Sequence, residues 1–92
     1  MDKYDQLALK LEKALNVLDA LKSSNHATNE FLNSYREYTK AIRIKAINKE
    51  LPATDGALMG LLRWLSDYDE LADNDELWRE ISEIEKFHLE NF

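Results

Sequence analysis

The stretch TDGALMGLLRWLSDYDEL, residues 54–71, decides how the rest of the chain is interpreted. Large apolar residues recur in it at steps of three and four, the spacing that places side chains on one side of an α-helix: Leu58, Leu61, Leu62, Leu65 and Tyr68. A second stripe lies beside the first: Ala57, Gly60, Trp64 and Leu71. Apolar side chains thus cover about half of this helix, more than on an ordinary surface helix. We expect it to be the most buried element, with Leu61, Leu62 and Leu65 in the core.

The start of this helix is marked by turn-forming and capping residues. Pro52 ends the element before it, and Thr54 or Asp55 can accept hydrogen bonds from the first-turn N–H groups. The composition also favours helices, because the chain of 92 residues has only two glycines and one proline. With 45% hydrophobic and 33% charged residues it falls within the globular range. We predict one all-α domain, residues 1–92.

Two further helices precede the central one. Residues 3–22 carry an amphipathic seam whose members alternate at steps of three and four: Tyr4, Leu7, Leu11, Ala14, Leu18 and Leu21. Residues 26–49 follow a turn at Ser23, Ser24 and Asn25, whose side chains offer capping oxygens. The apolar stripe of this second helix consists of Phe31, Tyr35, Tyr38, Ile42 and Ala46.

A fourth helix is predicted over residues 75–91. Asp73 and Glu76 have the spacing of a capping box, with Asp in place of Ser or Thr. The inner stripe consists of Leu77, Ile81, Ile84 and His88. Because the connections are short, the four helices (3–22, 26–49, 55–72 and 75–91) should form an antiparallel four-helix bundle.

The second half of the second helix does not follow its own stripe. Ile44, Ile47 and Leu51 point to nearly the opposite side from Phe31 and Tyr38. Either the helix bends or ends near Arg43 and the chain wraps under the central helix, or a second subunit covers these residues. The second stripe of the central helix raises the same question, since the two sets can close on each other within one chain or form an exposed patch. We expect a homodimer, with Trp64 as its anchor and a candidate interface that comprises Ile44, Ile47, Leu51, Gly60, Trp64 and Leu71.

Charge is distributed unevenly along the chain. Residues 51–92 carry three basic and eleven acidic side chains, a net charge of −8, whereas the whole chain has −6. Such a field disfavours generic binding to nucleic acid or to anionic membranes. The basic cluster, Arg36, Lys40, Arg43, Lys45 and Lys49, has tyrosines interleaved as in some nucleic-acid sites. Because those tyrosines lie on the apolar stripe, we interpret the cations as a solvated face or as salt-bridge partners of the acidic fourth helix.

Motifs for metal binding or catalysis are weak. The acidic run between residues 67 and 76 fails as a calcium loop, because Leu71 and Ala72 occupy a ligand position and the glycine position. Glu85 and His88 have the Glu-x-x-His spacing of di-iron bundles, but those sites require a second copy and further glutamates. The chain has no cysteine, two histidines and no Gly-rich phosphate loop. We therefore predict no metal, no cofactor and no enzymatic activity.

These observations favour protein–protein interaction as the function. We expect a small acidic helical adaptor, or an immunity- or antitoxin-type inhibitor, that binds a basic protein partner. The alternatives are a structural homo-oligomer and an acidic mimic of nucleic acid. The chain lacks the apolar centre of a signal peptide and any long apolar run, so we expect it to act in the cytoplasm and not in a membrane.

Overall fold

The computed structural model describes residues 2–50, 61 and 63–91. They contain helices α1 (Lys3–Ala20), α2 (His26–Ile47), α4 (Asp69–Ala72) and α5 (Asp75–Asn91), and residues 61 and 63–66 are also helical. The described residues include no strand, so the predicted all-α class is confirmed. None of these helices combines the length and the apolar character that a membrane span requires. Several residues named in the sequence analysis lie outside the described residues: Leu51, Pro52, Thr54, Asp55, Ala57, Leu58, Gly60 and Leu62.

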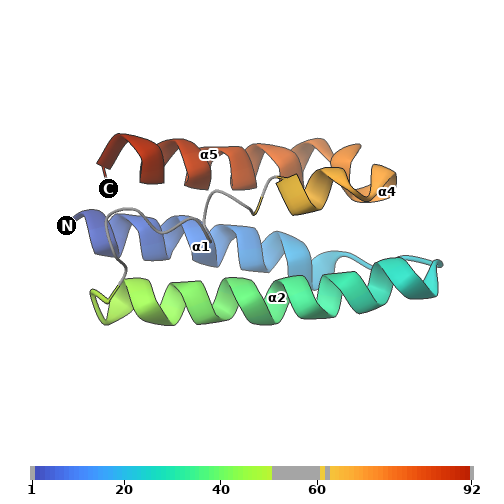
Figure 1. Cartoon of the computed structure of the whole chain (residues 1–92), viewed down its shortest axis with the longest axis horizontal. Coiled ribbons are helices and arrows are strands. Elements are labelled where there is room, and N and C mark those ends of the chain that lie inside the picture. Colours follow the sequence, from blue (N-terminus) through green and yellow to red (C-terminus); the bar gives the residue numbers. More distant parts are fainter. Residues whose placement is uncertain (1, 51–60, 62, 92) are drawn as a thin grey trace.

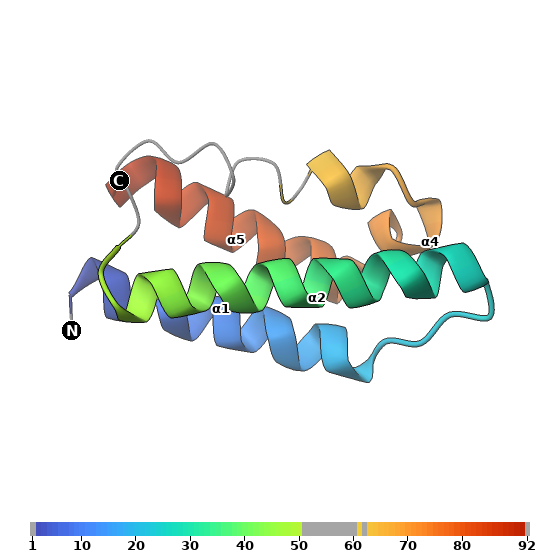
Figure 2. The same ribbon diagram turned by 60° about the horizontal axis from the view of Figure 1, so that its bottom comes forward.

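The helices run side by side as an elongated bundle of 39 × 19 × 19 Å (Figures 1 and 2). Helix α1 packs against both α2 and α5. The chain between residues 61 and 72 closes the remaining side, since Tyr68 stacks on Phe31 of α2 with ring centroids 4.1 Å apart and α4 contacts α5. This arrangement is roughly that of the predicted four-helix bundle.

The connection between α1 and α2 is fixed by side-chain hydrogen bonds to the backbone. Asn25 caps α2, because its Oδ1 accepts from the N–H of Thr28 at 3.2 Å. Arg36 reaches across from α2 and donates to the carbonyl oxygens of Leu18 (3.0 Å, from Nε) and Leu21 (2.8 Å, from Nη2) at the end of α1. The last carbonyls of a helix lack partners in the regular helical ladder, and the arginine supplies donors to them. The carbonyl of Leu18 also accepts from the N–H of Leu21 at 3.1 Å.

Tyr35, Ile42 and Ala46 of the stripe predicted for α2 are buried, whereas Leu32 and Thr39 take the places predicted for Phe31 and Tyr38. The members of the buried seam recur at steps of four and three: Thr28, Leu32, Tyr35, Thr39, Ile42 and Ala46. Phe31 and Tyr38 are only partly buried and flank the seam on the side of residues 61–72. The prediction missed Thr39 because its hydroxyl is polar, yet Oγ1 donates to the carbonyl of Tyr35 at 2.7 Å and the residue is fully buried.

Helix α2 does not end near Arg43, although the sequence allowed that possibility. It stops at Ile47, where Lys49 takes a left-handed conformation (φ 58°). The N–H of Lys49 donates to the carbonyl of Ala46 and that of Glu50 to Lys45, at 3.1 and 2.9 Å. These two bonds form a Schellman motif with lysine at the position that usually holds glycine.

The predicted continuous helix over 55–72 is wrong, because it is interrupted after Ser66. The N–H groups of Asp67 and Tyr68 donate three residues back, to Trp64 and Leu65, and Tyr68 then has an extended backbone that begins α4. Ser66 contributes to the break, since its Oγ donates to the carbonyl of Arg63 at 2.6 Å. Side-chain bonds of this kind compete with the helical ladder. The interruption lets both Leu65 and Leu71 reach the core.

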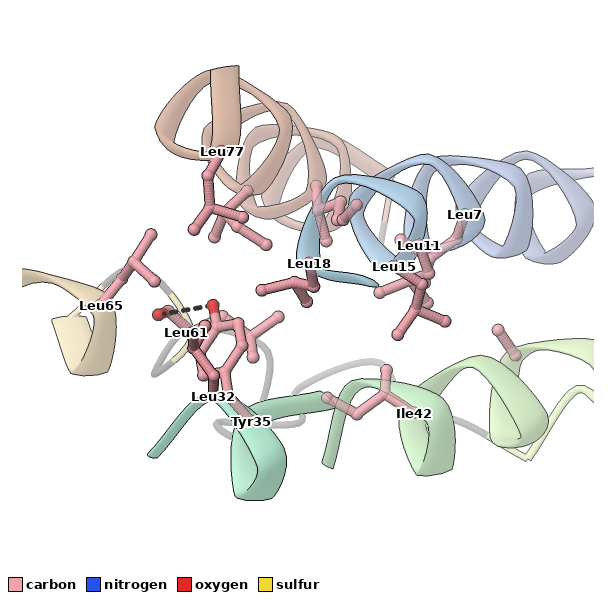
Figure 3. Close-up of a cluster of buried hydrophobic side chains, with 14 of the residues drawn as sticks. Leu7, Leu11, Leu15, Leu18, Leu32, Tyr35, Ile42, Leu61, Leu65 and Leu77 are labelled. Atoms are coloured by element: carbon pink, nitrogen blue, oxygen red, sulfur yellow. Dashed lines mark hydrogen bonds between the residues drawn. The ribbon is translucent and has the colours of Figure 1, made fainter. Parts of the chain in front are cut away.

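The core lies where α1, α2, α5 and the 61–72 segment meet (Figure 3). Leu61 and Leu65 are fully buried, as predicted. Leu77, Ile81, Ile84 and His88 form the inner side of α5, also as predicted. The predicted capping box of this helix is wrong, because Asn74, not Asp73, accepts from the N–H of Leu77 at 3.0 Å.

Leu65→Ala should lower the free energy of unfolding by about 2–5 kcal/mol, because it removes a fully buried side chain from a packed core. Urea denaturation followed by circular dichroism measures this change. Arg63→Ala, an exposed neighbour in the same helical segment, is the matched control and should shift the midpoint little. An unchanged midpoint for Leu65→Ala would contradict the placement of this segment.

Tyr35→Phe should cost about 1–3 kcal/mol, because it leaves a buried carbonyl without its donor. The phenol of Tyr35 donates to the carbonyl of Leu61 at 2.9 Å, and both residues are buried.

Burial also raises the pKa of Tyr35, with a further contribution from the nearby carboxylate of Glu85. The phenol should therefore stay protonated in alkaline solution until the protein unfolds. A spectrophotometric titration that showed Tyr35 ionising in the folded state at its ordinary pKa would contradict this account.

Candidate interaction surface

The described residues of the predicted interface do not lie together on one surface. Leu71 is only 3% exposed and belongs to the core of the single chain. Ile44, Ile47 and Trp64 are 56%, 47% and 41% exposed. Leu51 and Gly60 lie outside the described residues. Only three of the six predicted positions therefore offer apolar surface that the structure describes.

Trp64 lies on a different side of α2 from the two isoleucines. Its ring packs against Tyr38, with centroids 4.9 Å apart and planes inclined by 60°. Ile47 follows Tyr38 by nine residues, which places it on the opposite side of the helix at about 100° per residue. The structure therefore does not bring Trp64 together with Ile44 and Ile47.

Leu9 is a third exposed apolar residue, and it contributes to the same surface as Ile44 and Ile47. Leu9 is 45% exposed and lines, with Asp5, Ala8, Glu12 and Arg43, a hollow of about 240 Å³ between α1 and α2. Ile47 follows Arg43 by four residues and so lies beside it on the helix surface. We call the surface formed by Leu9, Ile44, Ile47 and the charged residues around them (Asp2, Glu12, Arg43 and Lys49) the α1–α2 face. Leu9 was not among the predicted interface residues, because it lies outside the apolar seam of its own helix.

The expected salt bridges between the basic cluster and the acidic fourth helix do not form among the described residues. Arg36 and Arg43 pair with α1, Lys49 pairs with the N-cap of α1, and Lys40 pairs with Glu37 of its own helix. Nζ of Lys49 lies 2.7 Å from Oδ2 of Asp2, and Nη2 of Arg43 lies 4.0 Å from Oε2 of Glu12. Nε of Arg36 lies 3.7 Å from Oδ1 of Asp19. As the residue number rises along α1 it falls along α2, as antiparallel neighbours require. This register can be found from the sequence once the two helices are known to be adjacent.

The opposite end of the molecule from the termini carries a second surface, which is acidic (Figure 1). We call it the acidic surface; its members are all exposed and comprise Asp67, Asp69, Glu70, Asp73, Asp75 and Glu76. Glu70 accepts a hydrogen bond from Oγ of Ser23 at 2.7 Å. Within the described part of the chain, none of the six forms an ion pair, so their charges are not neutralised locally.

The Glu-x-x-His pair does not gain further ligands in the described residues. His88 is 3% exposed, in the core stripe of α5, and Glu85 is partly buried. His26 is at the surface, with Nε2 3.0 Å from Oε1 of Glu30. Among residues 2–50, 61 and 63–91, no three histidine or carboxylate side chains gather as a metal site would require. The absence of metal binding stays a prediction.

Comparisons of the chain with protein-family models, with curated proteins and with solved structures gave no match. The function is therefore inferred from the two surfaces. One combines apolar residues with paired charges, and the other consists of unpaired carboxylates.

The ion pair between Lys49 and Asp2, at the edge of the α1–α2 face, predicts a measurable shift in the pKa of Asp2. The hydrogen bond from Lys49 lowers the pKa of Asp2 below 3.8, and the N–H of Asp5 adds to the effect. A carboxyl group with a lowered pKa in the folded state stabilises the fold above its unfolded pKa, and this contribution is lost as the pH falls through the folded value. Lys49→Gln should therefore raise the pKa of Asp2 in an NMR titration.

The matched control is Lys40→Gln, which removes a lysine of the same helix that pairs with Glu37 and not with Asp2. It should leave the pKa of Asp2 unchanged. Equal values of this pKa in the wild type and in Lys49→Gln would contradict the ion pair.

Proposed function

We propose that this protein is a non-enzymatic interaction module, a small acidic helical adaptor or an immunity- or antitoxin-type inhibitor, that binds a basic surface of another protein. The acidic surface is the single observation that carries the proposal. Six exposed carboxylates within ten consecutive residues, without a cation among them in the sequence, create a field of one sign at one end of the bundle. Such a field accelerates encounter with a positively charged partner and disfavours acidic ones.

The contrast with the rest of the surface supports this proposal. Elsewhere exposed charges of opposite sign are interspersed and several form ion pairs, as Lys49 does with Asp2 and Lys40 with Glu37. The electric fields of the two charges in an ion pair largely cancel at a distance. The acidic surface retains its charge because the described residues supply no counter-ion, and a basic partner would supply one.

The location of the carboxylates also fits a role in binding more than a role in stability. Four of them lie in or beside the short helix α4, which depends on the contact of Leu71 with the core and not on charge pairs. Carboxylates that stabilise the fold would be expected at caps or in ion pairs. Asp69 and Glu70 lie in the first turn of α4, and Asp75 and Glu76 lie in the first turn of α5, where negative charge is favourable. The case for a role in binding therefore depends on Asp67 and Asp73, which lie outside the helices and outside any ion pair of the described residues.

Within this proposal the protein acts in the cytoplasm, without a metal or cofactor, and forms homodimers. A structural homo-oligomer is the second candidate, and it is favoured by the exposure of Leu9, Ile44 and Ile47. The two functions are compatible, because the α1–α2 face and the acidic surface are separate.

Capture from a lysate of the host organism, read by mass spectrometry, tests the proposed function. The wild-type chain should retain a basic protein, and retention should fall as salt is raised from about 50 to about 300 mM, since screening shortens the reach of the charges. The triple variant Asp67→Asn, Asp73→Asn, Glu76→Gln should reduce the affinity for this partner at least about tenfold, because charge pairs at an interface contribute on this scale.

The matched control is Glu80→Gln, Glu83→Gln, Glu90→Gln, which removes the same number of charges from α5 outside the acidic surface. It should retain the partner. Equal losses in both triple variants would show that only net charge matters and would contradict a specific role of the acidic surface. Retention of no basic protein by the wild-type chain would contradict the proposed function.

A further inference from the structure

The α1–α2 face has the properties of a surface that is complementary to itself. Its apolar residues come from both helices: Leu9 from α1, and Ile44 and Ile47 from α2. Its charges are divided between the same helices, with the carboxylates of Asp2 and Glu12 on the side of α1 and the cations of Arg43 and Lys49 on the side of α2. The two helices lie next to each other in both views of the bundle (Figures 1 and 2).

A two-fold axis parallel to the helices would place α1 of one copy over α2 of the other. Such an axis leaves the height of each residue along the bundle unchanged and exchanges the two sides of the face. Two residues at the same height along the bundle axis within one chain are therefore also at the same height across the contact. Asp2 would oppose Lys49 of the second copy, and Glu12 would oppose Arg43.

The apolar residues match under the same operation. Helices rise about 1.5 Å per residue, so Leu9 lies about 4.5 Å from Glu12 towards the start of α1. On antiparallel α2 that direction leads from Arg43 towards Ile47, and the height of Leu9 falls between Ile44 and Ile47. In the dimer Leu9 would therefore pack between the two isoleucines of the second copy.

Arg43 provides an independent reason for a partner at this position. The ion pair of its guanidinium with Glu12 is long, at 4.0 Å, and the side chain is 35% exposed, so it can accept a second carboxylate from outside the chain. An arginine fork binds carboxylates best through two parallel bonds. The second copy would bring another Glu12 to the same guanidinium and would exclude water from the pair.

We propose that the α1–α2 face is a homodimer interface in which Leu9 of each chain packs against Ile44 and Ile47 of the other and Glu12 pairs with Arg43 across a two-fold axis parallel to the helices. The acidic surface remains exposed in this dimer, so the assembly presents two of them. The proposal does not depend on the recognition of a basic partner, because the acidic surface and the α1–α2 face are tested by different variants.

Light scattering across a concentration series tests whether the dimer exists and where its interface lies. The wild-type chain should approach twice its mass of 10.8 kDa by about 100 μM, a concentration at which a contact of this modest apolar content is expected to be populated. Ile44→Glu should remain at 10.8 kDa with an unchanged helical circular dichroism spectrum, because Ile44 is already exposed in the single chain.

Leu89→Glu is the matched control, since Leu89 is equally apolar and 63% exposed but lies on α5. It should form dimers like the wild type. A wild-type mass of 10.8 kDa at about 500 μM, a concentration that would populate even a weak dimer, would overturn the proposal. A dimer that Ile44→Glu leaves intact and Trp64→Glu dissociates would overturn it as well, in favour of an interface at Trp64.

Exchange of the charges tests the orientation of the axis. Arg43→Glu alone places two carboxylates in opposition across the contact, and Glu12→Arg alone places two guanidinium groups in opposition, so each variant should be monomeric. An equimolar mixture of the two variants brings opposite charges together across the interface and should form a heterodimer of twice 10.8 kDa. Circular dichroism of each variant confirms folding beforehand. Folded variants that do not associate when mixed, or that each form dimers alone, would contradict the proposed axis.

Discussion

The hydrogen bond from Tyr35 to the carbonyl of Leu61 is the interaction on which the rest of the structure depends. It joins the middle of α2 to the segment that closes the core, and it lies among the side chains that meet there (Figure 3). A phenol in a core needs an acceptor, and this carbonyl in turn gains a donor. Because Leu61 is held in this way, Leu65, before the break at Ser66, and Leu71, after it, are also buried in the core. The rings of Trp64 and Tyr68 then rest on Tyr38 and Phe31.

The closed core determines which apolar residues remain at the surface. Residues 61–72 cover the side of α2 that carries Phe31 and Tyr38, so Ile44 and Ile47 are left facing away from it. The same closure places α4 and its carboxylates at one end of the bundle, far from the ion pairs that Arg43 and Lys49 form with α1 and its cap. Two surfaces of different chemistry result. The proposed homodimer uses the apolar one, and the proposed recognition of a basic partner uses the acidic one.

Much of the fold could be predicted from spacing alone. The seam of α1 and the inner stripe of α5 consist mainly of aliphatic residues at regular helical steps, so their burial followed directly. The predicted limits of α5 agree with the structure, whereas α1 ends at Ala20 and not at residue 22. In α2 the predicted stripe shared Tyr35, Ile42 and Ala46 with the buried seam, but it included the aromatic residues Phe31 and Tyr38 in place of Leu32 and Thr39. The break after Ser66 could not be predicted from periodicity, because the apolar pattern continues across it to Leu71. It arises from competing hydrogen bonds of a serine and from the need to bury Leu71.

The candidate site was harder to predict than the core. Exposed apolar residues follow no periodic rule, and Leu9 is recognisable only once α1 and α2 are known to be adjacent. The size of Trp64 made it the predicted interface anchor, whereas its ring is partly covered by Tyr38 within the chain. The acidic surface was visible in the sequence as a run of carboxylates. That the described residues leave it without ion pairs follows from the pairing of the basic residues of α2 with α1 and its cap.

The central claim is that one chain closes its own core with Leu61, Leu65 and Leu71 and leaves Ile44 and Ile47 outside it. Relaxation of methyl signals by a soluble paramagnetic probe tests this claim most directly, in a dilute sample in which any dimer has dissociated. The account predicts strong relaxation of the methyl groups of Ile44 and Ile47 and little relaxation of those of Leu61, Leu65 and Leu71. Relaxation of the three leucines comparable with that of the two isoleucines would contradict it.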